Sequence, residues 1–209
     1  MGSRAGVRGT ALASLEAAFR GARGAWADRG GHMGRLRDSA DEFAFTMAEV
    51  ARELMQARTV TETLVRVSQL CVETVPGCDH AGVLLVRGEQ VQTLASTSQL
   101  VVDSDRAQGE LREGPCYDAA RDATWFRVVH MGAEKRWPRY APRARELGIG
   151  AMMGFQLFTD SDQLGALDMY ADQPYGFTAM SEQLAWIFAS HATVAVAASR
   201  AGDQLRLSE

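Results

Sequence analysis

The chain has 209 residues, of which 46% are hydrophobic and 23% are charged, and its formal net charge is −4. These values are ordinary for a globular domain with a sizeable core, and they give no general reason to expect nucleic acid or anionic lipid as a partner. No apolar run is long enough to cross a bilayer, and the three cysteines form no CxxC pair. We therefore expect a cytoplasmic protein that is not bound to a membrane and holds no cysteine-based metal site.

Residues 1–37 differ from the rest of the chain, because they contain eight of the 20 glycines together with seven arginines. Apolar residues recur at three- and four-residue steps after Thr10, as in a short amphipathic helix. Gly21 and Gly24 weaken that helix. We expect a loosely attached N-terminal tail or an accessory helix here.

Two helices are predicted next. Asp38 and Ser39 are suitable caps for the first, whose apolar face consists of Phe43, Met47, Val50 and Leu54. Thr59 and Glu62 have the spacing of a capping box at the start of the second helix, and the Pro-Gly pair at 76–77 ends it.

After residue 80 the pattern changes to that of strands. Residues 81–87 and 90–97 flank a Gly-Glu pair and predict a hairpin. The elements predicted after the hairpin are a polar helix at 98–111, a helix beginning near Pro115, a strand at 125–131, a helix at 137–147, strands at 151–158 and 164–170, and a long helix at 178–205. This order favours an α+β fold with a mostly antiparallel sheet, terminal helices packed on one face, and short helices and loops over the other.

Four segments carry a family resemblance: residues 112–122 (REGPCYDAARD), 135–158 (KRWPRYAPRARELGIGAMMGFQLF), 164–177 (LGALDMYADQPYGF) and 187–205 (IFASHATVAVAASRAGDQL). Together they resemble the GAF domains of actinobacterial GAF–ANTAR regulators over about residues 40–203. The resemblance implies a GAF domain at residues 38–205, including N-terminal helices and a long C-terminal helix, with an antiparallel sheet of about five or six strands.

The same resemblance implies a sensor module that forms a homodimer through its terminal helices. It also implies an unidentified small molecule bound under the helices and loops on the other face of the sheet. In the family an ANTAR domain that binds nascent RNA follows the GAF domain, and this chain ends about where ANTAR would begin. We therefore expect no ANTAR domain and no direct nucleic-acid binding by this chain.

The candidates for the ligand pocket are Cys116, Tyr117, Trp125, His130 and Met152. Cys116 follows a proline at the predicted start of a helix, where the helix dipole lowers the pKa of a thiol. The alternative is that Cys116 packs as a small apolar residue. His130 and Met152 stand where the family usually has Asp and Ser, and a histidine at that place is either a ligand or an ordinary strand residue.

The terminal helices supply the candidates for a dimer interface. On the last helix an apolar seam is formed by Leu184, Phe188, His191, Ala195 and Ala198. With Phe43, Met47, Val50 and Leu54 of the first helix, this seam is suited to an intermolecular four-helix bundle. The alternative is that both helices cover the sheet of their own chain.

We expect a non-catalytic sensor that responds to a small ligand or to redox state and signals through its helical dimer interface in antitermination-type transcription regulation. One alternative is a protein-interaction scaffold without a ligand. Another is a thiol redox enzyme similar to the free methionine-(R)-sulfoxide reductases, with Cys116 as nucleophile, although the resolving cysteine about ten residues earlier is missing. No cofactor is required by the sequence, and the histidine spacing favours no metal site.

Overall fold

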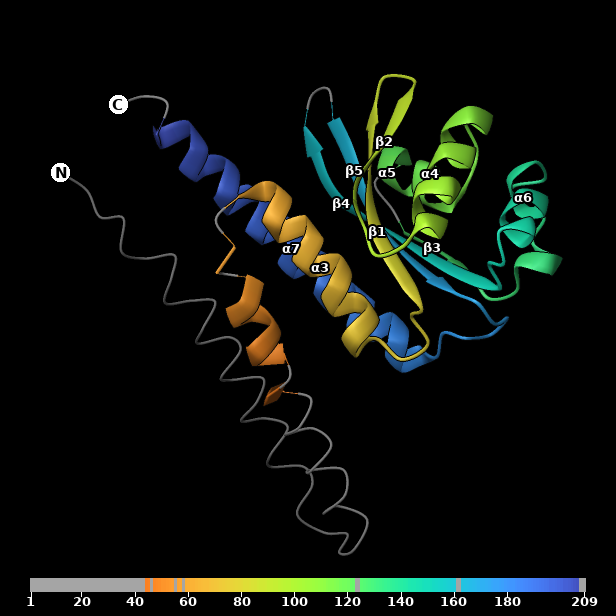
Figure 1. Ribbon diagram of the computed structural model, residues 1–209, viewed down its shortest axis with the longest axis horizontal. Coiled ribbons are helices and arrows are strands. Elements are labelled where there is room, and N and C mark those ends of the chain that lie inside the picture. Colours follow the sequence, from red (N-terminus) through yellow and green to blue (C-terminus); the bar gives the residue numbers. More distant parts are fainter. Residues whose placement is uncertain are drawn as a thin grey trace, which may run out of the picture. The chain divides into compact units, whose positions relative to one another are not determined.

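The computed structural model describes residues 44–45, 47–54, 56–57, 59–122, 125–160 and 163–206 (Figure 1). The chain divides into two compact units, Met1–Ala48 and Glu49–Glu209. In the first unit the described residues, 44–45 and 47–48, are helical. The expectations for residues 1–37 and for Phe43 lie outside the described residues. The fold below is that of the second unit.

The N-terminal part of this unit is helical, as predicted. Residues 49–54 form a helical segment, and α3 follows at Val60–Thr74. The Thr59 side chain accepts a hydrogen bond from the Glu62 backbone N–H at 3.1 Å, which confirms Thr59 as the cap of this helix. The buried face of α3 includes Leu64, Val67 and Cys71.

Five strands of the described chain form one antiparallel sheet in the order β2-β1-β5-β4-β3. Their bounds are β1 His80–Arg87, β2 Gln90–Ser96, β3 Trp125–Val128, β4 Ala151–Asp160 and β5 Gln163–Ala171. The predicted α+β fold class with an antiparallel sheet is confirmed. The strand predicted at 125–131 is too long by three residues, because the chain turns after Val128 into the short 3-10 helix η1, Met131–Ala133.

Helices cover both faces of this sheet (Figure 1). On one face α3 packs beside α7, Ala179–Arg206, and these two helices contact β1, β2 and β4. On the other face lie α4 at Gln99–Leu111, α5 at Pro115–Asp122 and α6 at Tyr140–Glu146. This arrangement confirms the predicted layers, with helices from both chain ends on one face and the mid-chain helices on the other.

The helix predicted at 137–147 is shorter than expected, since α6 begins only at Tyr140. Its first turn is held by a carboxylate from outside the helix. Glu113 accepts hydrogen bonds from the backbone N–H groups of Arg139 at 2.7 Å and Tyr140 at 3.0 Å. These bonds satisfy N–H groups that have no partner within the helix, so α6 is positioned by the residue that precedes α5.

Among the described residues, no helix combines the length and apolar character needed to span a membrane.

Candidate functional site

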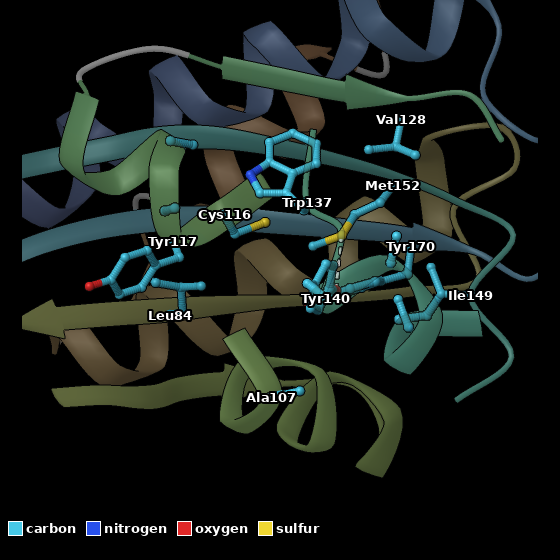
Figure 2. Close-up of a cluster of buried hydrophobic side chains, with 14 of the residues drawn as sticks. Leu84, Ala107, Cys116, Tyr117, Val128, Trp137, Tyr140, Ile149, Met152 and Tyr170 are labelled. Carbon is cyan, nitrogen blue, oxygen red and sulfur yellow. Dashed lines mark hydrogen bonds between the residues drawn. The ribbon is translucent and has the colours of Figure 1, made fainter. Parts of the chain in front are cut away.

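Buried side chains pack between the sheet and helices α5 and α6. Figure 2 shows Cys116, Trp137, Tyr140 and Met152 directed into one buried cluster. Cys116, Tyr140 and Met152 are completely inaccessible to solvent. The Tyr140 hydroxyl donates to the Met152 sulfur at 3.3 Å and lies 2.7 Å from the Ser104 hydroxyl. This part of the predicted pocket is therefore packed core.

Cys116 is held by the first turn of α5. The backbone N–H groups of Cys116 and Tyr117 donate to the side-chain carbonyl of Gln108 at 2.9 and 3.2 Å. Burial raises the pKa of the Cys116 thiol well above its usual value, and the nearby Asp168 raises it further. The thiol is therefore protonated at neutral pH despite its place at a helix N-terminus. This geometry favours the packing interpretation of Cys116 over the thiolate interpretation.

The predicted pocket residues do not all come together. Cys116, Tyr117 and Met152 belong to the same cluster. Trp125 lies on the opposite face of the sheet, where its ring stacks on Phe155 with centroids 5.6 Å apart. Its placement in the pocket was wrong because side chains alternate along β3, and the Trp125 side faces α7.

His130 is also absent from the cluster. It lies beyond the end of β3, as the residue before η1, and its ring meets Tyr175 with centroids 5.5 Å apart. The register of an extended strand, on which its placement in the pocket depended, does not continue to this residue.

Two buried carboxyl groups, which sequence reasoning missed, lie beside this cluster. Asp105 on α4 accepts hydrogen bonds from the Thr93 hydroxyl at 2.7 Å and the Tyr170 hydroxyl at 3.3 Å. Asp168 on β5 is completely buried. Neither of its oxygens makes a hydrogen bond of normal geometry within the described structure, although Asp105, Cys116 and Tyr170 are close enough to affect its pKa.

Burial raises the pKa of both carboxyl groups, and the interaction between them raises the pKa of Asp168 and lowers that of Asp105. For Asp105, burial raises the pKa to about 6, while hydrogen bonding with Asp168, Thr93 and Tyr170 acts in the opposite direction. For Asp168, burial and then the charge of Asp105 raise the pKa well above the usual value for Asp. Like charges so close in a dry environment do not both ionise readily, so the pair retains a proton near neutral pH.

Two glycines bring the helices close to Asp168. In the sheet register, Gly82 of β1 and Gly154 of β4 are the partners of Asp168 on either side. A Cβ at Gly82 would collide with Val101 of α4, and a Cβ at Gly154 would lie 2.7 Å from the Cys116 sulfur. The missing side chains therefore let α4 and α5 approach the sheet around the carboxyl pair.

An open groove of about 720 Å³ lies between α4 and the β1–β2 hairpin. Asp105 and Thr93 line it, together with charged residues that include Arg87, Arg106 and Glu110. Arg106 is paired with Asp103 at 2.6 Å. The groove is thus the side from which solvent or a solute approaches the carboxyl pair. The described residues contain no group of three or more His, Cys, Asp or Glu side chains arranged to hold a metal ion.

The sequence does contain a signal for both acids. Asp168 interrupts an otherwise apolar strand, LGALDMYA, and Asp105 follows Val101 by four residues on the buried face of α4. An acidic residue on an apolar face is informative, because carboxylates are rarely buried without a partner.

The candidates for the dimer interface are distributed between core and surface. Val50, Leu54, Leu184 and Phe188 are buried within the single chain. His191 and Met47 are half-buried, and Phe43 and the side chains of Ala195 and Ala198 lie outside the described residues. The exposed stripe of α7 is a different one, formed by Trp186, Ser190 and Val194 at four-residue steps.

Comparison with known families identifies this fold. The model of the GAF domain family matches residues 57–197, which is more than half of the chain. The chain therefore belongs to the GAF domain family, a family of sensor and regulatory modules. A comparison with curated proteins found no match.

Solved structures share the fold at low identity. They include the chromophore-binding domain of an unusual bacteriophytochrome from R. palustris, with a TM-score of 0.63 and 12% identity over 78% of this chain and 63% of that chain. The GAF domain of a phosphoenolpyruvate-protein phosphotransferase from Acinetobacter has a TM-score of 0.57 and 12% identity over 77% of this chain and 95% of that one. The free methionine-R-sulfoxide reductase from Neisseria meningitidis, in complex with its substrate, has a TM-score of 0.59 and 15% identity over 75% of this chain and 89% of that one. This chain thus spans less than two thirds of the bacteriophytochrome chain, and at these identities the likeness concerns the fold alone.

Proposed function

We propose that this protein is a non-catalytic, cytoplasmic GAF sensor that works as a homodimer in antitermination-type transcription regulation. The observation that carries the proposal is the exposed apolar stripe of α7. Trp186 and Val194 expose 44% and 68% of their surface on a helix in which Leu184 and Phe188 are buried. Exposed apolar side chains gathered on one helix face are typical of a surface that pairs with a partner, here a second copy of the chain.

A small ligand is a better candidate for the signal than an oxidant. The groove between α4 and the β1–β2 hairpin is open to solvent and lies on the sheet face opposite α7. In contrast, Cys71, Cys78 and Cys116 are all buried, and burial raises the pKa of each thiol. A buried, protonated thiol reacts slowly with oxidants.

Two other functions remain as alternatives. The packed cluster under α5 and α6 favours an interaction scaffold without a ligand. The thiol redox enzyme has less support, because it needs a reactive sulfur and Cys116 is completely buried beside a carboxyl group.

Native mass spectrometry of the full chain tests this proposal. We expect a dimer for the wild type and a monomer for Val194→Glu, because the new charge would be buried in the pair. Val129→Glu is the matched control, since Val129 is an exposed valine, at 44%, that lies beyond the end of β3 and not on α7. A monomeric wild type, or a Val194→Glu dimer as tight as the wild type, contradicts the proposal. A small molecule retained by the wild type distinguishes the sensor from the scaffold.

A further inference from the structure

The Asp105–Asp168 pair joins a helix to the middle of the sheet through two acidic side chains, without a positively charged partner. Asp105 belongs to α4 and Asp168 to β5, the central strand. Most buried carboxylates are paired with a cation or accept several hydrogen bonds. Asp168 has neither within the described structure, and no cation contributes to the pKa of either acid. This environment is unusual for a pair of buried carboxyl groups.

Four of the elements packed around the pair contribute a group that stays neutral between pH 6 and 8. From β5 comes Tyr170, from α5 Cys116 and from α6 Tyr140, and burial raises the pKa of each well above its usual value. From β2 comes the Thr93 hydroxyl, which does not titrate. On the solvent side Arg106 is paired with Asp103, and Glu89 with Arg112. The two carboxyl groups are therefore the titrating groups at this place.

The protonation state of the pair determines how well α4 fits against the sheet. With one proton, a carboxyl and a carboxylate can lie together, since one donates a hydrogen bond to the other. Without it, two negative charges face each other in a dry core, and hydration is the available way to separate them. The groove that Asp105 lines admits water at that point.

The remaining attachment of α4 to the sheet is local and apolar. Val101 of α4 fits over Gly82, and Val91 of β2 fits over Gly109 of α4, at 2.8 Å from where a Cβ would be. Asp105 lies between these two contacts on the same helix. A change at Asp105 therefore acts on the part of α4 between them.

We propose that the Asp105–Asp168 pair is a proton-controlled latch, in which a proton shared by the two carboxyl groups keeps α4 on the sheet and loss of that proton releases α4 and widens the groove. The latch adds a regulatory input, the proton, to the proposed sensor function, and it does not depend on the dimer. It also explains why the groove is lined by an acid that is itself almost inaccessible.

Hydrogen exchange of the full chain, measured by mass spectrometry between pH 6 and pH 8 and corrected for the intrinsic pH dependence of exchange, tests the latch. If opening releases one proton, the opening constant of α4 rises about tenfold per pH unit. We expect this slope for residues 99–111, while α3, at residues 60–74 of the same molecules, shows less than a twofold change. An unchanged protection of α4 across this range overturns the proposal.

Variants separate the pair from other causes. Asp168→Asn removes the acid with the more strongly raised pKa, so the slope for α4 is expected to fall to near zero. Asp105→Asn leaves Asp168 buried but removes the charge beside it, so the slope is expected to fall below the wild-type value. Asp103→Asn is the control, because Asp103 lies on the same helix but bonds Arg106 and Gln99 at the surface. It should retain the wild-type slope. A slope that persists in both Asp168→Asn and Asp105→Asn, or one that disappears in Asp103→Asn, contradicts the latch. Failure of these results leaves the proposed dimer untouched, since native mass spectrometry tests that separately.

Discussion

The packing of Cys116 against Gly154 leads to a prediction that separates a structural cysteine from a reactive one. Gly154→Ala places a Cβ 2.7 Å from the Cys116 sulfur, 3.2 Å from the Cys116 Cα and 3.3 Å from the Pro115 carbonyl oxygen. Overpacking of this kind destabilises a protein by about 1–3 kcal/mol. We expect about 2 kcal/mol here, because α5 must move away from β4 by several tenths of an ångström.

The second variant of the cycle is Cys116→Ala, which removes the sulfur that the new Cβ would meet. Alone it leaves a small void, and we expect a loss of about 1 kcal/mol, as for deletion of one buried methyl-sized group. Combined with Gly154→Ala it relieves the shortest of the three contacts. The free energy of unfolding of the double variant should therefore be about 1 kcal/mol higher than the sum of the two single effects predicts. Part of the strain remains, since the contacts to backbone atoms stay.

Urea denaturation followed by circular dichroism gives the four free energies of unfolding. Effects that add within about 0.3 kcal/mol would refute the reasoning, because residues in contact are expected to couple. A large loss of stability for Cys116→Ala in both backgrounds would also contradict it.

Three more predictions concern the charge of two carboxyl groups and the access of reagents to the buried thiols. Asp105→Asn should stabilise the protein at pH 8 and have little effect near pH 4, measured by urea denaturation at both values. The folded state holds a proton on Asp105 up to about pH 6, so wild-type stability falls as pH rises from about 3.9 through 6, and the full difference above that range corresponds to about 3 kcal/mol. Asp103→Asn should show no such pH dependence. Glu113→Gln should destabilise the protein by about 1 kcal/mol at pH 7, because its carboxylate holds the start of α6. Although burial opposes ionisation, hydrogen bonds from Tyr140 and Arg139 lower the pKa of Glu113, so the difference should shrink as the pH falls through that lowered pKa; a constant difference would argue against the capping role. Finally, the three buried thiols should react with an aromatic disulfide reagent at least about 100-fold more slowly in the native protein than in urea, and rapid native labelling of Cys116 would favour the redox enzyme.

The fold could be predicted because its signals are local and repeated. Apolar runs separated by turn residues predicted four strands to within two residues of their ends, and the Thr59 cap marked the start of α3. The errors fall where a distant contact decides the boundary. β3 ends early because the chain turns after Val128 into η1, where the Met131 N–H bonds to the Gly150 carbonyl at 2.8 Å. The start of α6 depends on Glu113, a residue 27 positions before Tyr140, and no local pattern reveals such a cap.

The candidate site was harder to predict, because it depends on which face of the sheet each side chain takes. Trp125 and Phe126 are neighbours in sequence. Trp125 stacks on Phe155 and meets Trp186 edge-on, whereas Phe126 meets Trp137 on the other face. One residue of register thus separates the two layers. The position of Cys116 at a helix N-terminus was also a poor guide to the ionisation state of its thiol. The helix dipole favours a thiolate only where burial does not oppose it, and here burial dominates.

The central strand gives the physical link between the proposed groove and the proposed dimer surface. Asp168 faces α4 and α5, and its neighbours Leu167 and Met169 point to the opposite face, where α3 and α7 pack. All three side chains are completely buried, so a shift of β5 changes the packing on both faces. A change in the charge of the carboxyl pair that displaces this strand therefore disturbs the layer of α3 and α7, which contact its neighbours β1 and β4. A strand that is buried on both sides is what a sensor needs if it responds at one face of a sheet and signals from the other.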